Sequence, residues 1–106
     1  MSGAVPNEAR GEAALMVGEH CLTVRPTFAA LVAAERETGP LIALVERAAD
    51  GRLGLAEMEA LLWHCLADRP EAMARADLGD ALIAQGVGVA LPALRAIMRQ
   101  VVAGGA

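Results

Sequence analysis

The chain has 106 residues, which is enough for one hydrophobic core and too few for two domains. All nine basic residues are arginine, so the chain has no lysine for a P-loop or for Schiff-base chemistry. The only serine is Ser2, which argues against an ordered serine triad. The net charge of −4 argues against binding to a phosphate backbone. These exclusions favour a binding or assembly protein over an enzyme.

The sequence also predicts where the protein works. Its two cysteines indicate reduced thiols rather than a disulfide framework. Residues 1–10 lack the apolar core of a signal peptide and are expected to form a disordered leader, followed by a single domain over 11–106. The apolar stretch 87–94 is too short for the roughly 20 residues that cross a bilayer. We therefore expect a cytoplasmic protein, whose 56% hydrophobic content leaves apolar surface for a partner.

A β-hairpin is predicted first, with strands at 11–17 and 20–25. Gly18-Glu19 lies between two apolar runs, as in a two-residue type II′ turn. The resulting cross-strand pairs are Leu15 with Leu22, Ala13 with Val24 and Val17 with His20 on one face, and Met16 with Cys21, Ala14 with Thr23 and Glu12 with Arg25 on the other. Because a two-stranded ribbon is barely stable alone, one face must pack on helices, while its edges remain open to another chain.

From residue 26 onward, the spacing of apolar residues predicts five short helices. They are expected to run approximately from Pro26 to Gly39, from Pro40 to Asp50, from Gly54 to Leu66, from Asp77 to Gln85 and from Gly88 to Ala103. The first helix carries Phe28, Leu31, Val32 and Glu35 along one side, and the second is expected to turn Leu41, Leu44, Val45 and Ala48 inward. The third has one apolar stripe, formed by Leu55, Met58, Leu61, Leu62, Cys65 and Leu66. The fourth bears Leu78, Ala81 and Leu82, and the last carries Leu91, Leu94, Ile97, Met98, Val101 and Val102 on one face. An N-terminal hairpin packed on a bundle of about five short helices is an α+β fold.

Four residues are candidates for a partner-binding surface. Trp63 lies about 130° from the centre of the apolar stripe on its helix. It either packs at the edge of the core or serves as an exposed anchor for a partner, since tryptophan is favoured at binding hot spots. The other three candidates, Met16, Cys21 and Thr23, lie on the outer face of the hairpin.

No catalytic, cofactor-binding or metal-binding residue is predicted. The dipeptide His20-Cys21 recurs as His64-Cys65, but neighbouring side chains diverge on a strand or helix and cannot converge on zinc. His64 and Asp68 are expected to form a solvated pair. The acidic pairs Glu35/Glu37, Glu57/Glu59 and Asp77/Asp80 are expected on the solvated surface without a paired base. The arginines 47, 52, 95 and 99 are interspersed with acids and lack aromatic partners, so nucleic-acid binding is not expected.

One resemblance covers nearly the whole chain after residue 9. Arg10-Gly11-Glu12, followed by residues 22–31 with the sequence LTVRPTFAAL, resembles the gene transfer agent protein family encoded among phage-like tail genes. The resemblance continues through residues 41–47 with Gly51 after them, and ends at residues 90–94. Gly54 departs from it, because a Ser or Thr cap is expected there in relatives. Members of the family are described as tail tube proteins or as tail assembly chaperones.

The resemblance implies a role in building a siphophage-type tail. Tail chaperones are thought to coat the long tape-measure protein, keep it soluble and yield to the tube subunit as the tail polymerises. We therefore expect a non-enzymatic tail assembly chaperone that binds the tape-measure protein, with the tail tube protein as a second partner, and that forms homo-oligomers. The alternatives are a structural tube subunit, for which a short hairpin offers little strand, and an unrelated helical interaction module.

Overall fold

The computed structural model describes residues 11–104, and the leader predicted for residues 1–10 lies outside this range. The elements in chain order are β1 (Ala13–Val17), β2 (His20–Val24), α1 (Phe28–Thr38), α2 (Leu41–Ala49), α3 (Leu55–Cys65), α4 (Arg75–Gln85), the 3₁₀ helix η2 (Val87–Ala90) and α5 (Leu91–Ala103). A two-stranded antiparallel sheet followed by five α-helices confirms the α+β class.

The two strands pair in the predicted register throughout. Gly18 at the turn has a φ of 62°, while no residue other than glycine has a positive φ between residues 11 and 104, which is the combination that a type II′ turn requires. The buried inner face carries Leu15, Val17, Leu22 and Val24. On the outer face Arg25 Nε donates to Glu12 Oε2 at 2.7 Å, as the sequence predicts.

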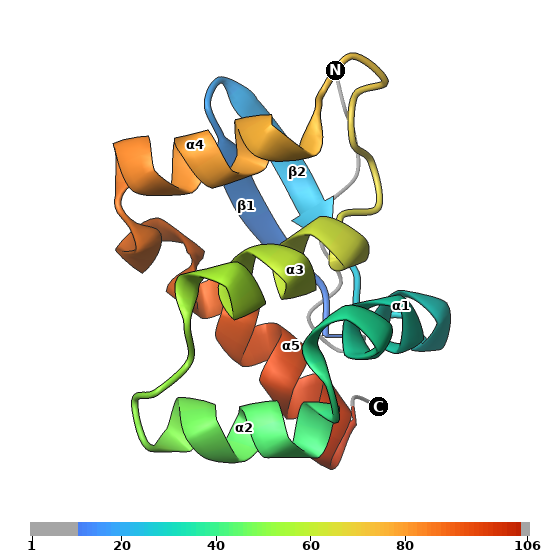
Figure 1. Cartoon of the computed structure of the whole chain (residues 1–106). Helices are drawn as coiled ribbons and strands as arrows, with labels where there is room; N and C mark the ends of the chain where they lie inside the picture. The colour runs from blue at the N-terminus through green and yellow to red at the C-terminus, as the bar shows by residue number, and fades with distance from the viewer. Residues whose placement is uncertain (1–10, 105–106) are drawn as a thin grey trace.

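Helix α3 lies at the centre of the molecule, with the hairpin and α4 on one side and α1 and α2 on the other (Figure 1). It packs against α1, α4 and α5. Its buried residues are Ala60, Leu61, Leu62 and Cys65. Helices α4, η2 and α5 pack on β1, so the inner face of the hairpin is covered by helices, as its marginal stability requires.

Helix starts follow their capping hydrogen bonds. Helix α1 begins after Thr27 rather than at Pro26, because Thr27 Oγ1 accepts from the Ala30 N–H at 3.1 Å. Helix α4 begins at Arg75 rather than Asp77. The reason is that Asp77 Oδ2 accepts from the N–H of the residue before the helix at 2.8 Å, so Asp77 is a capping residue inside the first turn.

The last predicted helix is divided in two. Residues 87–90 form the 3₁₀ helix η2, and α5 follows directly with Pro92 in its first turn. Helix α3 starts after Gly54 as predicted, with Glu57 Oε1 accepting from the Gly54 N–H at 2.9 Å. Because glycine has no side chain, only the glutamate half of the capping box is present.

The sides of the helices that the apolar pattern marks are only partly buried. Phe28 is 84% exposed, while Ala34 of α1 is fully buried. Leu55 and Val102 are likewise exposed, and the buried positions of α5 include two alanines, at 93 and 96. Because alanine allows helices to approach closely, these small residues can occupy helix contacts that the apolar pattern assigns to larger ones.

Candidate functional site

The outer face of the hairpin is only partly the surface that the sequence predicts. Met16 is 43% exposed and Cys21 is exposed, as expected. Thr23 is only 5% exposed, so its predicted place on an open surface is wrong. The predicted partner-binding residues therefore do not form one continuous exposed face.

Thr23 is buried because the segment that follows α3 covers the outer edge of β2. The Thr23 N–H donates to Asp68 Oδ1 at 2.8 Å, and the Thr23 carbonyl accepts from the Ala67 N–H at 2.9 Å. The Arg25 N–H donates to the Cys65 carbonyl at 2.7 Å. The same segment forms an antiparallel bridge to the residue after Thr23. This half of the strand edge is therefore already paired.

The edge of β1 is held at the turn by Gln85, the last residue of α4. Gln85 Nε2 donates to the Met16 carbonyl at 2.9 Å, and Gln85 Oε1 accepts from the Gly18 N–H at 2.9 Å. The hairpin is thus fixed to the helices along both edges. It offers less free edge to another chain than the sequence predicts.

Trp63 lies at the edge of the core. It is partly buried and packs against the buried cluster. The Arg69 guanidinium carbon lies 4.1 Å from the ring centroid, and Arg69 Nη1 donates to the Trp63 carbonyl at 2.6 Å. This cation–π contact covers one face of the ring. The geometry matches the core-edge interpretation, and contact with a partner stays a prediction.

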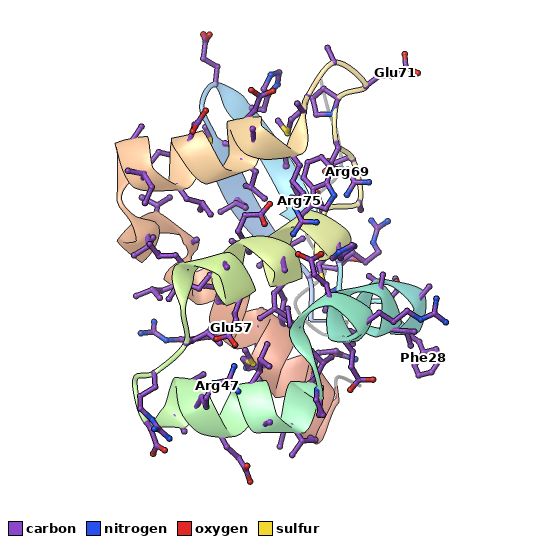
Figure 2. All side chains as sticks on the ribbon, in the orientation of Figure 1. Phe28, Arg47, Glu57, Arg69, Glu71 and Arg75 are labelled. Atoms are coloured by element: carbon purple, nitrogen blue, oxygen red, sulfur yellow. The ribbon has the colours of Figure 1, made fainter. Side chains whose placement is uncertain are left out.

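A cluster of ion pairs joins α1, α3 and α4 around Arg75, which is labelled in Figure 2. Arg75 Nε donates to the two carboxylate oxygens of Glu59 at 3.0 and 2.8 Å, and Arg75 Nη1 donates to Glu37 Oε1 at 2.8 Å. His64 Nε2 lies 2.9 Å from the same Glu37 oxygen. The predicted pairing of His64 with Asp68 is therefore wrong, because each side chain has a partner in another element.

These contacts shift the pKa values of Glu37 and Arg75. The hydrogen bonds from Arg75 and then from His64 lower the pKa of Glu37 to about 2. In return, the hydrogen bonds to Glu59 and Glu37 raise the pKa of Arg75. Glu37 is therefore a carboxylate at neutral pH, and its contacts link α1 to α3 and α4.

Other acids of the predicted solvated pairs also have structural partners. Glu57 caps α3 and pairs with Arg47 of α2 (Figure 2). Glu35 Oε2 accepts from the Leu41 N–H at 3.0 Å, at the start of α2. Both acids keep contact with solvent, and each also has a structural partner that the sequence did not predict. They connect neighbouring elements, which short helices need because each buries little area by itself.

An apolar groove lies between α2 and α5. Its volume is about 440 Å³. The apolar residues along it include Val45, Ala48 and Ala49 of α2, Met58 of α3, and Leu91 and Met98 of α5. Arg95 is the only charged residue in the lining. The groove could not be predicted from sequence, because most of these residues belong to the apolar stripes of three separate helices.

A second groove, of about 410 Å³, lies where α1, α2 and α5 meet. Phe28 and Ile42 line it and are 84% and 57% exposed. Figure 2 shows the Phe28 side chain projecting away from α1. Both grooves are lined mainly by residues of the helices.

Between residues 11 and 104, no group of three or more His, Cys, Asp and Glu side chains is placed to hold a metal ion. Within the same range no single helix has the length and apolar character to cross a membrane, although α4 and residues 87–103 together meet those criteria as a pair bent by 112°.

A short hairpin on a small helical body with open apolar grooves is typical of a protein-interaction domain. Residues 10–104 match the model of the family described as phage tail tube protein, GTA-gp10. Because the match spans nearly the whole chain, the protein belongs to this family and is a phage or gene transfer agent tail protein. The match rules out an unrelated helical module. No curated protein and no solved structure matches the chain significantly.

Proposed function

We propose that the protein is a non-enzymatic tail assembly chaperone that binds the tape-measure protein in the bacterial cytoplasm while the tail is built. The observation that carries the proposal is the apolar groove of about 440 Å³ between α2 and α5. A chaperone of a long polypeptide needs apolar surface that is open in the free protein and is covered when the client binds. The net charge of −4 would then keep the complex in solution.

The arrangement of the acids supports a role without catalysis. Glu37 and Glu59 hold Arg75, while Glu57 holds Arg47 and the start of α3. Carboxylates occupied in this way are not free to act as general acids or bases. The acidic residues of these pairs therefore serve the fold, and the groove between α2 and α5 is lined mainly by apolar residues.

A structural tube subunit is the second candidate, and the description of the family favours it. A subunit that closes a ring through its strands needs free strand edges. Here Asp68 and Ala67 occupy the edge of β2, and Gln85 occupies part of the edge of β1. These contacts favour the chaperone over the tube subunit.

Co-expression with the tape-measure protein from the same gene cluster tests the proposal. The tail tube protein serves as a second bait, because we expect it as a second partner, and an unrelated acidic protein of similar size serves as the control. Rescue of soluble tape-measure protein in a stable complex is the expected result. Failure to bind it, together with co-assembly into tubes, would establish the structural subunit instead.

A further inference from the structure

We propose that the groove between α2 and α5 binds one amphipathic helix of the tape-measure protein, and that a carboxylate on this helix pairs with Arg95. The inference rests on the proposed function and specifies its contact site. The groove has the two features that such a ligand requires: an apolar lining of about 440 Å³ and one charged residue, Arg95, in that lining.

The lining favours a helix over an extended segment. The groove lies between two helices, whose backbone groups are hydrogen-bonded within the helices themselves. An extended chain in this groove would find few backbone partners and would leave its own N–H and C=O groups unsatisfied. A helix satisfies these groups internally and presents only side chains, as in other helix-in-groove complexes.

The size and flexibility of the lining residues favour a protein ligand over a small molecule. Ala48 and Ala49 leave room for incoming side chains, and Met58 and Met98 can adjust to their shape. Sites for small molecules generally add several converging polar groups to an apolar pocket. Arg95 is the only charged group in this groove, so it can orient one charge but cannot define a small ligand.

The charge of Arg95 identifies the complementary group. Arg95 is exposed and forms no ion pair within the part of the chain that the structure describes. Arg47 and Arg52, which are near the groove in sequence on α2 and the loop after it, pair with Glu57 and Asp50. An uncompensated arginine at an apolar groove selects a helix that carries an Asp or Glu beside its apolar face.

The experiment measures binding of the full chain to the co-expressed tape-measure protein for two groove variants. Arg95→Glu reverses the charge, and Arg36→Glu makes the same change at an exposed, unpaired arginine on α1 as its control. Ala49→Trp fills the groove without a change in charge, and Ala84→Trp places the same side chain at an exposed position of α4. We expect both groove variants to weaken binding by about tenfold or more, and both controls to bind like the wild type.

The outcomes separate the two proposals. If the wild type binds the tape-measure protein and both groove variants bind equally well, the groove assignment is overturned and the chaperone function stands. If the wild type does not bind it, both proposals fail. If Arg95→Glu changes only the oligomeric state in sedimentation, a second copy of the chain occupies the groove and the inference is wrong. Thermal unfolding of each variant identifies any that do not fold. Because the Arg95 side chain is exposed, Arg95→Glu is expected to fold and keeps the test valid if another variant does not.

Discussion

We expect the two cysteines to differ in reactivity, because their surroundings differ. Cys21 is exposed on β2, whereas Cys65 is 1% exposed and burial raises the pKa of its thiol to about 12. Because the thiolate is the reactive form, Cys65 is inert at neutral pH. We expect a thiol reagent to modify Cys21 alone in the native protein and both cysteines in denaturant. Cys21→Ser should abolish the native reaction, and equal reaction rates of the two thiols in the folded protein would contradict the burial of Cys65.

Glu37 links stability to pH through its contact with Arg75. Its pKa in the folded protein is about 2, below the ordinary value of 4.5. A lowered pKa stabilises the fold above the ordinary value, and this contribution is lost as the pH falls towards the folded value. We therefore expect Glu37→Gln to lower the melting temperature at pH 7, and the difference from the wild type to shrink between about pH 4.5 and pH 2.

The control for this measurement is Glu71→Gln. Glu71 projects from the loop before α4 (Figure 2) and forms no ion pair with any residue from 11 to 104. Its substitution should leave the melting temperature nearly unchanged at neutral pH, because an exposed unpaired charge contributes little. A pH-independent difference between wild type and Glu37→Gln would show that Glu37 acts through packing rather than through its charge.

Among the elements, the hairpin depends on Asp68 for its attachment to the helices. Asp68→Ala leaves the N–H of the buried Thr23 without its acceptor, which costs about 1–3 kcal/mol for an unsatisfied buried donor. The free energy of unfolding in urea measures this loss. Asp68→Asn keeps an acceptor oxygen and should lose less. Equal stability of Asp68→Ala and wild type would mean that solvent reaches the Thr23 N–H.

The hairpin could be predicted from sequence because its determinants are local. The glycine at the turn sets the register, and the two-residue period then assigns each side chain to a face. The faces of α1 and α5 could not be predicted fully, because Ala34 is buried while Phe28 is exposed. The apolar pattern of a helix points to its large side chains as the buried ones. Where two helices pack closely, small residues are also buried.

The site was harder to predict because its parts come from distant segments. The groove exists only where α2 and α5 lie beside each other, and neither helix alone indicates a gap between them. The burial of Thr23 likewise depends on Asp68, which is 45 residues away in the chain. Pairing over such a separation is a tertiary property, and sequence periodicity carries no information about it.

At the scale of the whole molecule, the second groove bears on self-association. Phe28 and Ile42 are both exposed beside this groove, so their burial would stabilise contact between copies of the chain. If each subunit has one such patch and the patches pair symmetrically, the assembly closes at a small number of copies. A tube subunit instead needs two different surfaces that continue the assembly.

We therefore expect discrete oligomers whose size does not grow with concentration, as measured by sedimentation velocity. Phe28→Ser should shift the population towards the monomer, and it should not lower the melting temperature, because the side chain is 84% exposed. Glu46→Gln, at another exposed position, provides the control. Open-ended polymers that lengthen with concentration would contradict this expectation, and they would favour the tube subunit over the chaperone.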